Sequence, residues 1–290
     1  MPGNPYVRLG GMRPLTVAAV QAEATPGDVA GNAARAARWA RIAADQGATV
    51  VVLPELFLPA YDPPALRASP ATTDVAADRG GWVADARLDP IRAAAADRAA
   101  AIVVGAAVRR PDGRRTCAAL VVDRRGRVAA AYDKQHLCGP EEKDLFIPGT
   151  RGTTLDIDGW RLGLGVCYDG CFPEHARAAA VAGADGYLCP SAYVRGSAHR
   201  RDVYYAARAL DNTMYVAFAN PVGGVDPWCF NGGAAVYDPE GRPLARGADD
   251  GEAVVVATLD AAELARVRAA HQMLAEHRTD LGADRAVLSG

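Results

Sequence analysis

The chain has 290 residues, of which half are hydrophobic and 23% are charged, and its formal net charge is −2. This composition is typical of a globular protein long enough to bury a core, and it excludes extensive disorder and low-complexity structure. Because acidic and basic residues are interspersed, it indicates no surface for nucleic acid or an anionic membrane, and a small-molecule partner is expected.

The beginning of the chain carries no targeting signal that the sequence reveals. Its first 14 residues hold two arginines and no apolar stretch, so neither a secretory signal nor a membrane span is predicted there. We therefore expect a cytoplasmic protein with a flexible segment at 1–14, one domain at 15–270 and a tail at 271–290 that packs on a partner subunit. None of the cysteine spacings matches paired zinc ligands, which predicts mostly buried, reduced thiols and no metal.

Short runs rich in Val, Leu and Ala predict ten strands. In chain order these are Leu15–Val20, Thr49–Leu53, Ala101–Val108, Ala118–Val122, Val128–Tyr132, Arg161–Val166, Gly186–Cys189, Met214–Ala219, Ala234–Tyr237 and Ala253–Leu259. Longer Ala- and Arg-rich stretches predict four helices. These are Asp28–Gln46, Pro90–Ala99, Pro173–Ala182 and His199–Asn212. Asp28 is expected to cap the first helix, and Gly47 to end it.

Turn sequences between apolar runs add hairpins to this α/β pattern. They are Asp123–Gly126, Asp158-Gly159 and Asp238–Gly241. The sheets are therefore predicted to be mixed. More than one sheet is expected, since ten strands with few helices would make a single open sheet unusually wide.

Three reactive side chains follow predicted strands directly: Glu55, Lys134 and Cys167. The carboxyl ends of strands are where α/β sheets usually place ligand sites, so we expect the three to lie together. Only two of the 32 basic residues are lysines, Lys134 and Lys143, which suggests that these positions need an ammonium. Taken singly, each also fits a structural role, such as a packed core thiol or half of a surface ion pair.

Together, these groups form a chemically coherent set. A carboxylate at Glu55 takes the proton of the Cys167 thiol, while a nearby ammonium favours the thiolate. As the thiolate adds to an amide carbonyl, Lys134 and the backbone N–H of Tyr168 stabilise the growing negative charge on oxygen. Ammonia then leaves, and water hydrolyses the thioester.

Three segments resemble the signature segments of the nitrilase superfamily of carbon–nitrogen hydrolases in type, order and separation. They are Leu53–Phe57, Tyr132–Leu137 and Gly165–Asp169. The similarity continues through Val20-Gln21, Phe146–Gly149, Phe172–Glu174, Pro190-Ser191, Ala207–Asn212, Ala219-Asn220 and Asp238–Gly241. Together, these similar segments extend over nearly the whole chain.

The resemblance implies that Glu55 is the general base, Lys134 the oxyanion-stabilising ammonium and Cys167 the nucleophile. It also implies a second glutamate before Phe146, which matches Glu142, with Glu141 as the fallback. The implied fold is a four-layer αββα sandwich, paired across one helical face into a homodimer or built into larger spirals, with no cofactor. The chain departs from many relatives at two positions, with Cys171 in place of arginine and Ala234 in place of serine.

The substrate class is left open between a small linear amide, which we favour, an N-carbamoyl compound and, less so, a nitrile. Other possibilities are a Cys–His hydrolase with His136 or His175 as base, and a silent binding module of the same fold. Less specific sequence patterns in the loops assign substrate binding to Tyr61, Tyr168, Tyr193, Arg195 and Trp228, with Phe230 nearby. A guanidinium of Arg195, Arg200 or Arg201 would favour an ω-amide bearing a carboxylate, although solvated arginines fit equally well.

Overall fold

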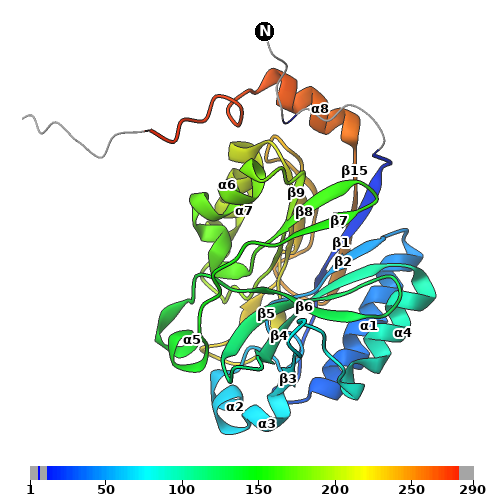
Figure 1. The fold of residues 1–290 in the computed structure, drawn as a ribbon, viewed down its shortest axis with the longest axis vertical. Helices are drawn as coiled ribbons and strands as arrows, with labels where there is room; N and C mark the ends of the chain where they lie inside the picture. Colours follow the sequence, from blue (N-terminus) through cyan, green and yellow to red (C-terminus); the bar gives the residue numbers. More distant parts are fainter. Residues whose placement is uncertain (1–5, 7–11, 281–290) are drawn as a thin grey trace, which may run out of the picture.

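The computed structural model describes residue 6 and residues 12–280 of the chain. Two mixed sheets lie face to face between outer helices (Figure 1). The expected flexible segment at 1–14 and the far end of the expected tail fall largely outside the described residues. No helix in the described ranges is long and apolar enough to cross a membrane.

The first sheet has seven strands in the order β15-β1-β2-β4-β5-β6, with β3 paired to β4. Its strands are β1 (Leu15–Gln21), β2 (Val50–Val52), β3 (Asp74–Ala76), β4 (Ala101–Arg109), β5 (Arg115–Val122), β6 (Val128–Asp133) and β15 (Ala253–Leu259). The central strands β1, β2 and β4 run parallel, while β15, β5 and β6 pair antiparallel at the sides. The sheet is therefore mixed, as predicted.

The second sheet has six strands in the order β14-β13-β10-β9-β8-β7. Its strands are β7 (Thr154–Ile157), β8 (Trp160–Leu164), β9 (Gly186–Pro190), β10 (Tyr215–Ala219), β13 (Ala235–Tyr237) and β14 (Pro243–Arg246). Strands β8, β9 and β10 are parallel, and hairpins add β7 and β14 at the edges. A small separate hairpin joins β11 (Val222–Gly223) to β12 (Phe230–Asn231).

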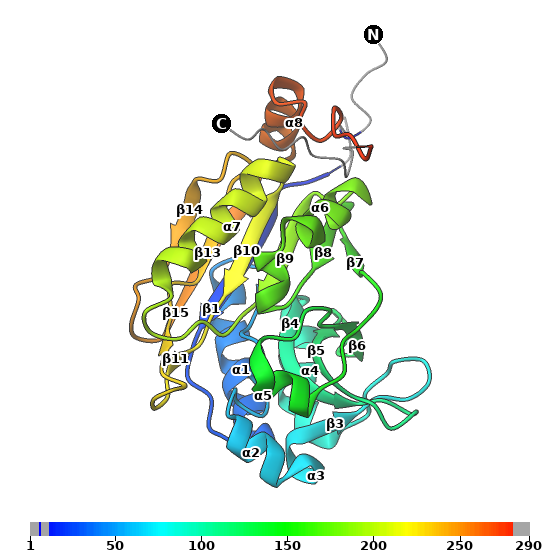
Figure 2. The same cartoon turned by 90° about the vertical axis from the view of Figure 1, so that its left-hand side faces the viewer.

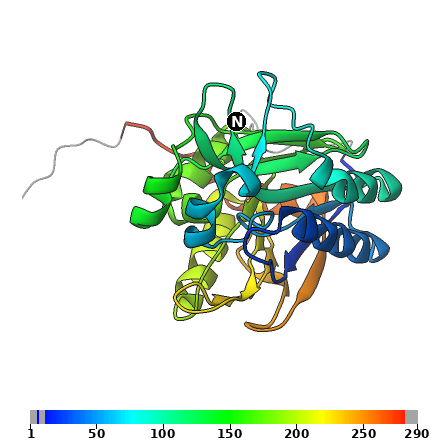
Figure 3. The same ribbon diagram turned by 90° about the horizontal axis from the view of Figure 1, so that it is seen from below.

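Helices cover the outer face of each sheet, so that the four-layer αββα order is confirmed. Helices α1 (Val29–Asp45) and α4 (Asp89–Arg98) lie together on the first sheet, and α6 (Pro173–Val181) and α7 (Ala198–Asn212) on the second (Figures 2 and 3). Further helical elements lie outside these two pairs. They are α2 (Pro63–Ala68), α3 (Pro70–Thr73), η1 (Ala86–Leu88), α5 (Gly139–Leu145), η2 (Cys167–Cys171) and α8 (Ala261–Ala270).

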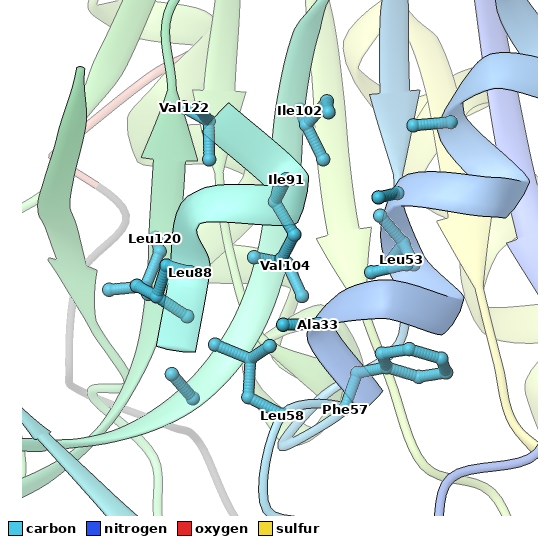
Figure 4. Close-up of a cluster of buried hydrophobic side chains, with 14 of the residues drawn as sticks. Ala33, Leu53, Phe57, Leu58, Leu88, Ile91, Ile102, Val104, Leu120 and Val122 are labelled. Atoms are coloured by element: carbon cyan, nitrogen blue, oxygen red, sulfur yellow. The ribbon is translucent and has the colours of Figure 1, made fainter. Parts of the chain in front are cut away.

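Alternation of side chains along the strands explains why the layers stack. On β1, Ala18 and Val20 belong to the core under α1 and α4, whereas Val17 and Ala19 belong to the core between the sheets. Successive residues of a strand point to opposite faces, so a strand that is apolar throughout must be covered on both sides. Figure 4 shows the helix-side core, in which Ile91 of α4 meets Val104 of β4.

All ten predicted strands and all four predicted helices form. The carboxylate of Asp28 accepts a hydrogen bond from the Gly31 N–H at 2.9 Å, which confirms the predicted cap of α1. The three predicted turns join β5 to β6, β7 to β8 and β13 to β14. The edge strands β7 and β14, the short strands β3, β11 and β12, and the helices α2, α3, α5 and α8 were not predicted.

Candidate active site

Glu55 lies in the tight turn that follows β2. Its N–H donates to the Ser191 carbonyl at 3.1 Å, which ties the turn to the strand end of the second sheet. The turn also packs directly on β4 at Gly105, where an added Cβ would lie 2.2 Å from the Leu56 nitrogen and 2.5 Å from the Pro54 oxygen. Only glycine permits this approach, which holds the Glu55 side chain between the sheets.

Lys134 follows β6, and its side chain is fully buried. The backbone is held on both sides, because its N–H donates to the Cys117 carbonyl and its carbonyl accepts from Gly149, each at 2.8 Å. Its ammonium donates to Glu55 Oε1 at 2.6 Å and to the two carboxylate oxygens of Glu142 at 2.8 and 2.7 Å. The structure thus brings together three of the four predicted catalytic side chains in a carboxylate–ammonium–carboxylate cluster.

Helix α5 carries Glu142, which is almost fully buried. Besides Lys134, its carboxylate accepts from the Cys138 N–H at 2.9 Å and from the Tyr61 hydroxyl at 2.7 Å. The fallback, Glu141, is only half-buried, and it has no recorded ion pair with Lys134 among the described residues. Of the two candidates, Glu142 is therefore the one in the cluster.

Cys167 begins the short helix η2 three positions after β8 ends at Leu164, and it is half-buried. Its φ of +46° is in the left-handed region, which is uncommon for a residue other than glycine and recurs among strained residues at functional sites. The Tyr205 hydroxyl donates to its carbonyl at 3.1 Å and helps to hold this conformation. The charges of Glu55 and Lys134 both act on its thiol, so Cys167 lies beside the cluster.

Burial and neighbouring charges set the protonation of this cluster. Burial raises the pKa of Glu55 to about 7, although the Lys134 ammonium opposes the rise. Burial, reinforced by the Glu55 charge, also raises the pKa of the Cys167 thiol well above its usual value. Burial alone would lower the pKa of Lys134, but Glu55 and Glu142 outweigh it and raise that pKa. The ammonium therefore stays charged while the resting thiol keeps its proton.

The two histidines considered as alternative bases belong to a separate network around buried Asp169. The Asp169 carboxylate accepts from the Val166 N–H at 3.0 Å and the Tyr132 hydroxyl at 2.7 Å, and it pairs with His136 Nδ1 at 2.8 Å. The Tyr132 hydroxyl also lies 2.8 Å from His175 Nε2. Within the described ranges neither imidazole has a recorded hydrogen bond to Cys167, and the network instead fixes the turn that carries it.

Cys117 and Asp169 were not expected at the site. The Cys117 thiol donates to Glu55 Oε1 at 3.5 Å from the neighbouring strand β5. No motif singled it out, since a buried thiol in an apolar strand is ordinary. Asp169 lies two residues after Cys167 within a signature segment, and this position could have identified it as a residue near the site.

The residues predicted to bind substrate separate into two groups. Tyr61 and Trp228 line a cavity of about 200 Å³ that also borders Glu55. Tyr193 is instead packed, with its hydroxyl 3.1 Å from Cys171 Sγ. Arg195 is exposed, and Tyr168 is half-buried with its ring edge on Phe172. The last three do not line this cavity.

Arg201 has a structural role in place of the considered substrate contact. It is fully buried, and its guanidinium donates to the carbonyls of Asn231 and Gly232 and to the carboxylates of Asp202 and Asp249, at 2.8 to 3.1 Å. All three of its nitrogens are thus engaged. A substrate carboxylate would have to displace these partners.

We expect Arg201→Met to lower the free energy of unfolding by about 3 kcal/mol, because buried carbonyls and carboxylates lose their donors. The neighbouring Arg200→Met, at an exposed position of the same helix, serves as the matched control and is expected to change stability by less than about 0.5 kcal/mol. Urea unfolding of both variants measures the difference. Equal stability of the two would contradict the structural role.

All six cysteines have free thiols. In the described part of the chain, no group of three or more His, Cys, Asp or Glu side chains is placed to hold a metal ion.

Two stacked mixed sheets and this thiol–carboxylate–ammonium cluster define a nitrilase-type α/β protein. The chain belongs to the carbon–nitrogen hydrolase family, whose model matches residues 16–269. It is 34% identical to a hydrolase of Pseudomonas protegens named for the region 5′ of pqqF, with 94% of this chain and 92% of that protein covered. It is also 30% identical to an omega-amidase of Homo sapiens, over 86% and 90% of the two chains.

Solved structures agree with this assignment. A mutant of the amidase from Nesterenkonia sp. AN1 superposes with a TM-score of 0.75 at 32% identity, covering 90% of this chain and 95% of that one. That structure shows covalent addition of the acetamide moiety of fluoroacetamide at its active-site cysteine. The protein is thus a carbon–nitrogen hydrolase with amidases among its relatives.

Proposed function

We propose that the protein hydrolyses a small linear amide to a carboxylate and ammonia through a thioester on Cys167. The observation that carries this proposal is the buried Lys134 ammonium held between Glu55 and Glu142, with Cys167 close enough for the charges of Glu55 and Lys134 to act on its thiol. The covalent adduct on the active-site cysteine of the Nesterenkonia amidase supports the choice of nucleophile.

In the proposed first half-reaction, Glu55 accepts the Cys167 proton as the sulfur attacks the amide carbon. The tetrahedral oxyanion is stabilised by the Lys134 ammonium and the backbone N–H of Tyr168. Glu55 then returns the proton to the leaving nitrogen, and the C–N bond breaks to release ammonia. A thioester remains on the enzyme.

In the second half-reaction, Glu55 takes a proton from water, whose oxygen attacks the thioester carbon. The C–S bond breaks, the carboxylic acid leaves and Cys167 recovers its proton. Glu142 accepts two hydrogen bonds from Lys134 and holds the ammonium in place, and Tyr61 in turn holds Glu142. Glu142 is therefore a positioning residue.

A substrate panel tests the reaction class with the purified protein. Short aliphatic amides, ω-amides of carboxylic acids, N-carbamoyl compounds and nitriles are incubated separately, and ammonia and carbon dioxide are measured. Ammonia alone from amides supports the proposal. Ammonia with carbon dioxide marks an N-carbamoyl hydrolase instead, direct nitrile turnover marks a nitrilase, and no turnover of any member favours a silent binding module.

The pH dependence follows from the raised pKa of Glu55. Because the base must be ionised to accept a proton, we expect kcat/KM for a neutral amide to fall as the pH decreases below about 7, approaching tenfold per pH unit. Initial rates from pH 5 to 9 measure the profile. A rate that stays constant down to pH 5 would show that no group with a pKa near 7 acts as base.

The proposal includes a cytoplasmic homodimer. Free thiols suit a reducing compartment. The outer helical face carries exposed apolar side chains, Val203 and Leu210 on α7 and Val181 at the end of α6, which suits pairing with a second copy.

We expect Val203→Asp to shift the protein from dimer to monomer in light scattering, because the carboxylate would be buried without a partner in the interface. Ile147→Asp, an exposed apolar position outside these helices, is the control and should leave the mass unchanged. A wild-type monomer, or a dimer that persists in Val203→Asp, would exclude pairing through this face.

A further inference from the structure

The cavity beside Glu55 has mostly apolar and aromatic walls. Its volume is about 200 Å³, and its lining includes Tyr61, Val225, Trp228 and Phe230. The Tyr61 ring lies 5.3 Å from the Trp228 ring and 6.0 Å from the Phe230 ring, centroid to centroid. Such walls suit an apolar group.

Tyr61 connects this cavity to the reactive cluster. Its hydroxyl donates to Glu142, so its polar end faces the cluster while its ring packs against the aromatic wall. Glu55 borders the cavity directly, and its charge acts on the neighbouring Cys167 thiol. A carbonyl carbon at Cys167 would therefore place its acyl substituent next to the aromatic wall.

The charges around the cavity are all of one sign. Its ionisable lining residues are Glu55, Asp62 and Tyr61, and no lysine, arginine or histidine is among the lining residues, all of which lie in the described part of the chain. The Asp62 carboxylate accepts from the Ala65 N–H at 2.8 Å as the cap of α2. An anionic substituent in this space would lose hydration without gaining a counter-charge.

The arginines considered as partners for a substrate carboxylate do not supply a positive charge in the cavity. Arg201 is saturated by its own partners, and Arg195 is exposed and outside the cavity lining. The expectation of an ω-amide bearing a carboxylate therefore has no cation here to support it. Position 225, in contrast, is a highly exposed lining residue, so the charge at the cavity mouth can be changed there.

We propose that this cavity is the acyl subsite and that it selects uncharged, apolar acyl groups over carboxylate-bearing ones. This inference rests on the proposed amide hydrolysis. It assigns Tyr61, Trp228 and Phe230 as specificity-determining residues.

The test compares two substrates of similar size, 4-oxopentanamide, which is neutral, and succinamate, which ends in a carboxylate. For the wild type we expect kcat/KM to favour the neutral amide by about 100-fold, the cost of an unpaired charge in the subsite. Val225→Arg should raise kcat/KM for succinamate relative to the neutral amide by about tenfold, whereas Val225→Gln, of similar length but uncharged, should not. A wild-type preference for succinamate, or identical selectivity of the two variants, would overturn the inference.

A second readout does not require turnover. Iodoacetamide alkylates Cys167, and mass spectrometry of the peptide that contains it measures how strongly each amide slows the modification. Protection by 4-oxopentanamide without protection by succinamate supports the subsite even if neither compound is hydrolysed, in which case only the proposed reaction fails. Equal or stronger protection by succinamate overturns the subsite even if amides are hydrolysed.

Discussion

Cys167→Ala is expected to reduce ammonia release from every hydrolysed amide by at least about 10⁴-fold, because the acyl group then has no nucleophile to which it can bind. The fold should persist, since alanine removes one sulfur atom from a half-buried position and keeps the same backbone. Cys171→Ala is the matched control: Cys171 is another half-buried thiol of η2, which hydrogen-bonds to the Tyr193 hydroxyl and has no proposed role in the reaction.

The rate of ammonia release and the mass of the protein during turnover together test the role of Cys167. In the wild type, rapid quenching during turnover should reveal a protein heavier by one acyl group, carried on the peptide that contains Cys167, and Cys171→Ala should retain that adduct. Retention of full activity in Cys167→Ala, or an adduct on Cys117, would refute the assigned nucleophile. Circular dichroism and thermal unfolding of each variant show whether the fold is kept.

Hydrophobic pattern predicted the body of the fold because most strands here are buried on both faces. Such strands are mostly apolar runs, as in Val50–Val52 and in the buried residues 101–108, where Gly105 is the one residue without an apolar side chain. Edge strands give a weaker signal. Thr154–Ile157 alternates exposed and half-buried residues, and β5 begins three residues before the predicted strand because Arg115 pairs with Arg109 across the hairpin.

Helix α8 carried a readable signal that was not used. Asp260 precedes an Ala-rich stretch, and its carboxylate accepts from the Ala262 N–H at 2.8 Å. Helix α5 was harder to recognise, because seven residues with glycine and proline at the start resemble a loop. Its position nevertheless matters most for the site, since it carries Glu142.

The cluster itself was predicted from strand ends and from the family resemblance, and the proximity of Glu55, Lys134, Glu142 and Cys167 follows that expectation. The scarcity of lysine was informative at one position only, because Lys143 is exposed on α5. Contacts between distant segments that no strand end or signature segment marks could not be predicted from the sequence. Cys117 meets Glu55 across 62 positions of the chain, and only the stacking of strands determines which thiol faces which carboxylate.

Lys134→Met is expected to abolish activity and to lower the free energy of unfolding by about 3 to 5 kcal/mol, because it leaves two carboxylates buried without their shared cation. Both Glu55 and Glu142 lie within 2.8 Å of the ammonium, and all three side chains are almost completely buried. Urea unfolding at pH 7 measures the loss. Lys143→Met, the exposed counterpart, should unfold like the wild type.

The pH dependence of this loss distinguishes an electrostatic cause from lost packing. The folded-state pKa of Glu55 is already about 7, above the value of 4.5 for a free glutamate, so the folded chain binds more protons than the unfolded chain between these values. Stability from this group is therefore present below about pH 4.5 and is lost as the pH rises through 7. Without the ammonium, the pKa of Glu55 rises further, so Lys134→Met should lose more stability than the wild type as the pH rises from 5 to 8.

A double variant tests the same cause. Adding Glu142→Gln to Lys134→Met should restore part of the lost free energy of unfolding. A loss of unfolding free energy that is the same at every pH would indicate packing alone.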